Sequence, residues 1–158
     1  MKVDSGYAEV NGTRLYYEVA GRGPPVVLIH GFTLDTRMWD DQFEVFAQRY
    51  KVVRYDVRGF GKSALPVLGE RYTHADDLMA LLKYLEIAKT HVVCLSMGGE
   101  IAINFTLEHP EVTQALVLVD SGLGGFQGTK EWNETFTSIL SRAKKGGVQV
   151  AKELWLNC

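Results

Sequence analysis

The amino-acid sequence predicts an α/β protein with a mostly parallel sheet flanked by helices. Apolar, largely β-branched runs recur at 26–29, 52–55, 91–95 and 115–119, and such runs are typical of strands buried on both faces of a sheet. Helical patterns separate these runs, and strand–helix–strand alternation leads to parallel neighbours. The start of the chain departs from this pattern, because it predicts an antiparallel hairpin.

The predicted elements follow one another from the N-terminus without an internal repeat. Residues 7–19 predict two strands around Asn11-Gly12, a dipeptide typical of hairpin turns. The elements expected next are a strand at 26–29, a helix at 38–48, a strand at 52–55, a helix at 74–87, a strand at 91–95, a helix at 98–108 and a strand at 115–119. The helix at 74–87 has leucines on one face, and Asp76 and Asp77 lie near its positive N-terminal end.

Beyond Asp120 the composition changes. Glycines at 122, 124, 125 and 128 predict a flexible connection. Two helical stretches follow at about 129–145 and 147–157, and no strand signal returns. We therefore expect an incomplete core domain over 1–122 and a helical unit over 123–158.

Composition and charge exclude several classes of function. With 158 residues, 46% apolar and 23% charged, the chain resembles an ordinary soluble globular protein. A net charge of −2 argues against nucleic acid as a partner. The first residues lack the apolar region of a secretory signal, and no apolar stretch approaches the ~20 residues of a membrane helix. Cys94 and Cys158 make neither a disulfide framework nor a metal cluster, so we expect a cytoplasmic protein without metal or cofactor.

The strongest signal for a site is the segment C-L-S-M-G-G at 94–99, where a buried strand ends and a helix begins. A sharp turn at such a junction exposes a serine hydroxyl above the sheet, and the close approach of strand and helix requires small residues around it. Gly98 and Gly99 meet this requirement, whereas Cys94 stands where the G-x-S-x-G pattern has glycine. Serine is also favoured as a helix N-cap, so this motif alone leaves both roles open for Ser96.

Further motifs accompany this segment. H-G-F at 30–32 follows a buried strand, and a backbone N–H of such a loop pairs with the N–H after the nucleophile to form an oxyanion hole. The two donors would be Phe32 and Met97. D-V-R-G-F-G-K-S, E-H-P-E and A-L-V-L-V-D-S-G also occur, at 56–63, 108–111 and 115–122. In this order, the motifs make residues 7–122 similar to the N-terminal part of the α/β-hydrolase superfamily, in the branch of lid-bearing esterases and enol-lactonase-like enzymes.

The resemblance implies hydrolysis of a small ester or lactone through an acyl-serine intermediate, with Ser96 as the nucleophile and no cofactor. Residues 123–158 resemble the beginning of the helical lid that covers such active sites. The aromatic residues Trp132, Phe136 and Trp155 would then shape the acyl pocket.

A phosphate-binding loop is a competing interpretation of Gly61-Lys62-Ser63. The pattern G-x-x-x-x-G-K-[ST] requires glycine where Asp56 stands, and a helix directly afterwards. Asp56 would place an anion beside the phosphate, and Pro66 disfavours a helix. This interpretation is rejected.

The residues that would complete a catalytic triad are missing. In the superfamily an acid and then a histidine follow the serine along the chain, and a serine hydroxyl is a poor nucleophile without a base. We therefore expect a truncated chain or a base supplied from elsewhere. Of the four histidines, only His30 is expected at the active-site end of the sheet, as a brace of the oxyanion loop or a surrogate base. Asp120 is a candidate acid or a structural residue, and Cys94 is expected to be a buried packing residue.

The strand at 115–119 would be left as an apolar sheet edge, which is a template for pairing. We therefore expect self-association or a complementing chain through this edge or through the lid helices. Three functions compete: a serine esterase or lactonase, a catalytically impaired fragment that binds a ligand or associates with itself, and acyl transfer or perhydrolysis on the same scaffold.

Overall fold

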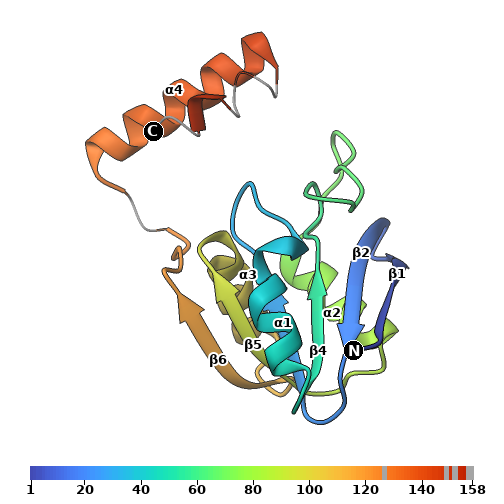
Figure 1. Ribbon diagram of the computed structural model, residues 1–158. Helices are drawn as coiled ribbons and strands as arrows, with labels where there is room; N and C mark the ends of the chain where they lie inside the picture. The colour runs from blue at the N-terminus through green and yellow to red at the C-terminus, as the bar shows by residue number, and fades with distance from the viewer. Residues whose placement is uncertain (126–127, 148–149, 151–152, 156–158) are drawn as a thin grey trace. The chain divides into compact units, whose positions relative to one another are not determined.

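The computed structural model describes residues 1–125, 128–147, 150 and 153–155 (Figure 1). The chain forms two units, Met1–Gly124 and Gly125–Cys158. The first unit is a six-stranded sheet in the order β1-β2-β4-β3-β5-β6 with helices on both faces. The α/β class predicted from the sequence is therefore confirmed.

The sheet begins with an antiparallel hairpin and continues as parallel strands. Its strands are β1 (Val3–Val10), β2 (Thr13–Ala20), β3 (Pro25–Ile29), β4 (Lys51–Tyr55), β5 (Thr90–Leu95) and β6 (Thr113–Val119). β2 pairs antiparallel with β4, whereas the pairs β3·β4, β3·β5 and β5·β6 are parallel. Asn11 and Gly12 have φ of 47° and 69°, the left-handed conformation that a two-residue hairpin turn requires.

The helices begin close to their predicted positions, but two of them end early. The described helices are a 3-10 helix (Thr36–Trp39), α1 (Asp40–Phe46), α2 (His74–Tyr84), α3 (Met97–Glu108) and α4 (Lys130–Gly146). The single helix expected at 38–48 is instead a 3-10 turn followed by the short α1. Helix α2 stops before residue 87, because Glu86 adopts a left-handed φ of 56° that ends the helix.

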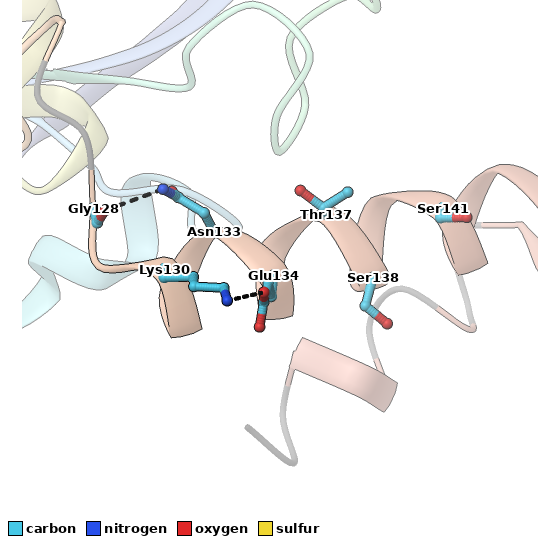
Figure 2. Close-up of a pocket in the computed structure, with 7 residues that line it drawn as sticks. All are labelled: Gly128, Lys130, Asn133, Glu134, Thr137, Ser138 and Ser141. Atoms are coloured by element: carbon cyan, nitrogen blue, oxygen red, sulfur yellow. Dashed lines mark hydrogen bonds and ion pairs between the residues drawn. The ribbon is translucent and has the colours of Figure 1, made fainter.

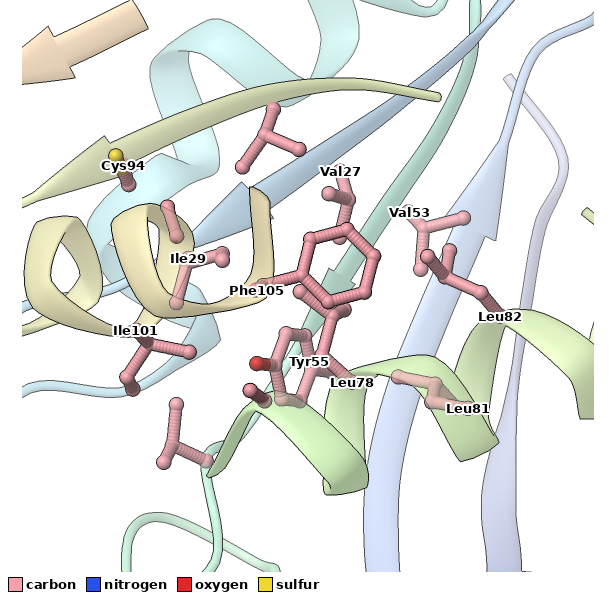
Figure 3. Close-up of a cluster of buried hydrophobic side chains, with 14 of the residues drawn as sticks. Val27, Ile29, Val53, Tyr55, Leu78, Leu81, Leu82, Cys94, Ile101 and Phe105 are labelled. Carbon is pink, nitrogen blue, oxygen red and sulfur yellow. The ribbon is translucent and has the colours of Figure 1, made fainter. Parts of the chain in front are cut away.

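The core lies on both faces of the sheet. On one face, α2 and α3 pack over the central strands, and Figure 3 shows Phe105, Leu78 and Tyr55 among the side chains buried there. On the other face, Trp39 and Phe43 cover Leu28. The strands β3, β4 and β5 are thus largely buried on both faces, which explains their apolar sequences. The run at 115–119 was expected to be buried as well, but β6 is the edge strand and most of its residues are exposed.

The second unit contains α4. Its apolar face carries Trp132 and Phe136, whose rings stack with centroids 6.2 Å apart, and the buried Ile139. Residues 150 and 153–155 are also helical. Of the helix expected at 147–157, Gly147 is not helical and has a φ of 82°, and the remaining residues lie outside the described ones. In the part of the chain that the structure describes, every helix is too short or too polar to cross a membrane.

Candidate active site

Ser96 occupies a strained turn between β5 and α3. Its φ of 51° and ψ of −111° lie where residues other than glycine are rarely found. Its side chain makes no capping hydrogen bond to α3, so the geometry does not support the N-cap alternative. A partly exposed serine at a strained strand–helix turn fits the nucleophile elbow expected from the sequence.

Two glycines allow the first turn of α3 to approach the sheet. A Cβ on Gly98 would lie 2.6 Å from the carbonyl oxygen of Ile29 and 2.7 Å from that of His30. A Cβ on Gly99 would lie 2.1 Å from Oγ of Ser121. Because any side chain would push the helix away, both positions require glycine for packing.

The H-G-F loop lies directly beside this elbow. A Cβ on Gly31 would meet the Leu95 side chain at 3.3 Å and its carbonyl oxygen at 3.6 Å. Phe32 is half exposed, and its ring packs edge-on against Phe60 with centroids 5.7 Å apart. The fold thus brings together the two loops whose backbone N–H groups, on Phe32 and Met97, are the expected oxyanion donors.

His30 is fully buried, and backbone groups engage both of its ring nitrogens. Nδ1 lies 2.8 Å from the carbonyl oxygen of Gly31, and Nε2 lies 3.0 Å from the backbone nitrogen of Val57. This pattern fits the neutral tautomer, in which Nδ1 donates to Gly31 and Nε2 accepts from Val57. Burial lowers the pKa of His30, which the hydrogen bond to Gly31 only partly opposes. The imidazole thus joins the H-G-F loop to the loop after β4, and both of its nitrogens are engaged, which does not fit a surrogate base.

The buried carboxylate of Asp56 ties two loops to the end of β4. Its Oδ1 accepts the backbone N–H of Thr36 at 2.7 Å, and its Oδ2 accepts that of Lys62 at 2.7 Å. The Lys62 ammonium lies over the Tyr16 ring, 4.0 Å from its centroid. Asp56 therefore fills the space inside the 56–63 loop, which is incompatible with a phosphate there, as the sequence predicted.

Arg58, in the same motif, is buried and takes part in a hydrogen-bond network that the sequence did not predict. Its Nε and Nη2 donate to the two carboxylate oxygens of Asp77 at 2.8 and 2.6 Å. Nη2 also donates to the carbonyl oxygen of Asn11, and the guanidinium lies over the ring of Tyr72. The motif thus joins the N-terminal hairpin to α2. A buried bidentate pair needs an acidic partner, but spacing could not indicate that Asp77 is that partner.

Comparison with known proteins agrees with this geometry. A family profile described as "alpha/beta hydrolase fold" matches residues 24–155. The chain belongs to the α/β-hydrolase family. The resemblance inferred from the motifs and the predicted fold, the N-terminal part of the α/β-hydrolase sheet, are thereby confirmed.

Individual relatives of this α/β-hydrolase chain include several enzymes. It is 32% identical over 114 residues to the soluble epoxide hydrolase of Corynebacterium sp. strain C12, covering 72% of this chain and 40% of that protein. It is 46% identical over 90 residues to a putative non-heme chloroperoxidase of Synechocystis sp., covering 55% of this chain and 33% of that protein. The enol-lactonase from Burkholderia xenovorans LB400 superposes with a TM-score of 0.83 at 28% identity, covering 96% of this chain and 58% of that structure. The chain therefore spans less than half of these two curated relatives and somewhat more than half of the enol-lactonase.

The other candidate catalytic residues of the α/β-hydrolase chain are dispersed. Asp120 follows β6 with a left-handed φ of 43° and an exposed side chain. It lies in the turn whose neighbouring backbone contacts Ser96, so it remains at the active-site end of the sheet. His91 lies at the start of β5 and His109 at the end of α3, and both are therefore at the far ends of those elements from Ser96. His74 begins α2 and packs on Tyr72.

Cys94 is completely buried beside the elbow. Its thiol donates to the carbonyl oxygen of Val117 at 3.3 Å. Burial raises the pKa of Cys94 to about 11, and the nearby Ser121 hydroxyl opposes this only in part. The thiol is therefore protonated at neutral pH and fits the packing role expected for it.

One group of possible metal ligands lies apart from Ser96. Side-chain ligand atoms of Asp76, Glu108 and His109 lie within 4.8 Å of one another, where the end of α3 meets the start of α2. Because Ser96 precedes the other end of α3, this group is separate from the elbow.

The second unit carries two hollows on α4. An open hollow of about 680 Å³, lined mostly by residues of polar type, follows the face shown in Figure 2. There Asn133 donates to the carbonyl oxygen of Gly128, and Lys130 pairs with Glu134. An apolar hollow of about 250 Å³ is lined by Trp132, Thr135, Phe136, Ile139 and Trp155. The three aromatic residues predicted for the lid therefore gather around one apolar space within this unit.

Proposed function

We propose that this protein is a serine hydrolase of carboxylic esters or lactones, with Ser96 as its nucleophile. The observation that carries the proposal is the left-handed backbone of Ser96 at the end of β5, next to the H-G-F loop. Such a conformation costs about 1–3 kcal/mol in a residue other than glycine, and proteins keep it mainly where function requires it. The likeness to an enol-lactonase supports a substrate of this class.

The proposed reaction proceeds in two acyl transfers. Oγ of Ser96 attacks the carbonyl carbon while its proton passes to a base, and the backbone N–H groups of Phe32 and Met97 stabilise the oxyanion. Collapse of the tetrahedral intermediate expels the alcohol, which takes the proton from the base. Water, deprotonated by the same base, then attacks the acyl carbon. The bond from that carbon to Oγ breaks, the base returns the proton to Oγ, and the acid is released.

The base is proposed to come from a group outside residues 1–158. His30 is not proposed for this role, because both its nitrogens are engaged by backbone groups. Asp120 remains the candidate acid, since it follows β6 beside the elbow. The small number of cysteines and the free, buried thiol of Cys94 favour a reducing compartment, so we propose a cytoplasmic location.

The decisive experiment measures hydrolysis of p-nitrophenyl acetate by the wild-type chain and by Ser96→Ala, with the exposed Ser5→Ala as a matched control. We expect turnover that Ser5→Ala retains and Ser96→Ala loses. Because an oxyanion hole alone gives about 10³–10⁴-fold acceleration over water, slow turnover common to all three proteins would contradict the role of Ser96.

A second candidate function is association through the sheet edge, by a hydrolase chain without independent activity. β6 is the edge strand, and Val117, Leu118 and Val119 keep 51%, 44% and 43% of their surface exposed. An apolar edge of this kind is a template for strand pairing with a second chain. Light scattering should find dimers or larger species for the wild type and monomers for Leu118→Lys. A strictly monomeric wild type would contradict this candidate.

A further inference from the structure

Three backbone hydrogen bonds fix the main chain of Ser96. Its N–H donates to the carbonyl oxygen of Val119 at 3.1 Å. Its carbonyl oxygen accepts the N–H of Gly122 at 3.1 Å and that of Gly99 at 2.8 Å. Two of these bonds come from the turn 119–122 that follows β6, so this turn and the first turn of α3 together fix the strained residue.

The side chain of Ser121 is the part of this turn that touches α3. The position of a Cβ on Gly99 lies 2.3 Å from Cβ and 3.0 Å from Cα of Ser121. The helix backbone at Gly99 therefore rests against Ser121 with no room between them, and it cannot move toward β6. Because Gly99 also donates to the carbonyl oxygen of Ser96, a shift of Gly99 would move the nucleophile.

The hydroxyl of Ser121 adds nothing evident to stability. Its Oγ is buried and, among the described residues, makes no hydrogen bond of regular geometry, although it lies beside the thiol of Cys94. A buried hydroxyl without a partner costs about 1–3 kcal/mol. Any role of the Ser121 side chain therefore comes from the contact of its Cβ with Gly99.

We propose that Ser121 is a positioning residue for Ser96, acting through its side-chain contact with Gly99. The inference rests on the proposed serine chemistry, but the positioning itself is a property of the backbone and is measurable without catalysis. A small shift of a nucleophile can cost about 10²-fold in rate. The side-chain carbon of Ser121 therefore sets where Oγ of Ser96 and the N–H of Met97 point.

The test compares Ser121→Gly, which removes the contact, with Ser121→Ala, which keeps the carbon and removes only the hydroxyl. Leu123→Gly is the matched control, since it adds a glycine two residues further on at an exposed position. Amide hydrogen exchange of Ser96 and Gly99, whose N–H groups are hydrogen-bonded in this turn, is measured for each variant, together with kcat and KM for p-nitrophenyl acetate. We expect Ser121→Gly to exchange these amides at least tenfold faster and to lose tenfold or more in kcat with KM unchanged. Ser121→Ala and Leu123→Gly should match the wild type in both measurements.

Each alternative outcome is decisive. Unchanged exchange in Ser121→Gly would overturn the positioning role, whatever the activity. A lower Tm with an unchanged kcat per folded molecule would make Ser121 a packing residue only. If the wild type shows no turnover that depends on Ser96, the proposed function fails for this chain, while the exchange measurement still decides whether Ser121 holds the backbone of Ser96.

Discussion

Nε2 of His30 accepts the backbone N–H of Val57 at 3.0 Å, joining the loop after β3 to the loop after β4. The two residues are far apart in the sequence, but β3 and β4 are parallel neighbours, so their carboxyl ends meet at the same edge of the sheet. This hydrogen bond requires a neutral imidazole, because a protonated Nε2 is itself a donor and could not accept the N–H of Val57. The H-G-F loop is therefore held by a histidine whose burial lowers its pKa and keeps the imidazole neutral.

We predict that acid weakens the fold through His30. Burial lowers the pKa of His30 in the folded protein below about 6.5, the usual value in an unfolded chain. The unfolded state therefore binds more protons in this range, so the stability that the neutral imidazole provides is present above pH 6.5 and is lost as pH falls through the folded pKa. Urea unfolding at pH 7.5, 6.0 and 5.0 measures this loss.

The His30→Gln variant separates the contribution of His30 to the pH dependence of stability from that of other titrating groups. One of these groups is His74, whose pKa is also lowered by burial. The glutamine amide oxygen can accept an N–H, as Nε2 does, but it does not titrate. We expect this variant to be about 1–3 kcal/mol less stable at pH 7.5 and to lose less stability between pH 7.5 and 5.0 than the wild type. An equal pH dependence in both proteins would assign the effect to other groups.

The second prediction concerns the buried carboxylate of Asp56. Asp56→Asn replaces one of two accepting oxygens by an NH₂ group, which then faces the N–H of Thr36 or Lys62. We expect a loss of about 2–4 kcal/mol in the free energy of unfolding, since a buried donor is left without a partner. Asp4→Asn, at an exposed ion pair with Lys2, should change it by less than about 1 kcal/mol. Similar effects of the two substitutions in urea unfolding would contradict the bridging role.

The third prediction concerns the close contact of α3 with β3. Gly98→Ala places a methyl group 2.6–2.7 Å from two backbone carbonyl oxygens, which cannot rotate away as a side chain could. We expect a loss of at least about 2 kcal/mol, measured by thermal unfolding, despite the higher helix propensity of alanine. Gly124→Ala, whose added Cβ would meet only a side-chain oxygen at 3.5 Å, is the control and should stay within about 0.5 kcal/mol. A stable Gly98→Ala protein would mean that the helix can move from the sheet at little cost.

The fourth prediction is that Cys94 is unreactive in the folded state. Burial raises the pKa of Cys94 to about 11, so the thiolate is scarce at pH 8 and reagents cannot reach it. In a Cys158→Ser variant, which leaves Cys94 as the one thiol of the sequence, Ellman's reagent should label the protein only after urea is added. Rapid labelling of the native variant would show that the thiol is open to solvent.

The sequence predicted the bounds of the central strands more accurately than the ends of the helices. The runs that became β3, β4 and β5 are apolar on both faces, and the structure places each strand within one residue of its expected bounds. The end of α2 was predicted three residues too late, because nothing in the type of Glu86 signals its left-handed conformation. The 3-10 turn before α1 was missed for a related reason: Trp39 and Phe43 keep a helical spacing, but Asp35 caps a shorter turn by accepting the N–H of Arg37.

The sequence by itself determined the fold class, the position of Ser96 between a buried strand and a helix, and the presence of the H-G-F loop, because each of these depends on residues that are neighbours in the chain. Only the tertiary structure decided that backbone groups engage both ring nitrogens of His30, that Arg58 pairs with Asp77, and that Ser121 rests on Gly99. These contacts join segments that meet only through the strand order of the sheet. Local patterns set the periodicity of each segment, whereas the close approach of distant backbones depends on how strands and helices pack together.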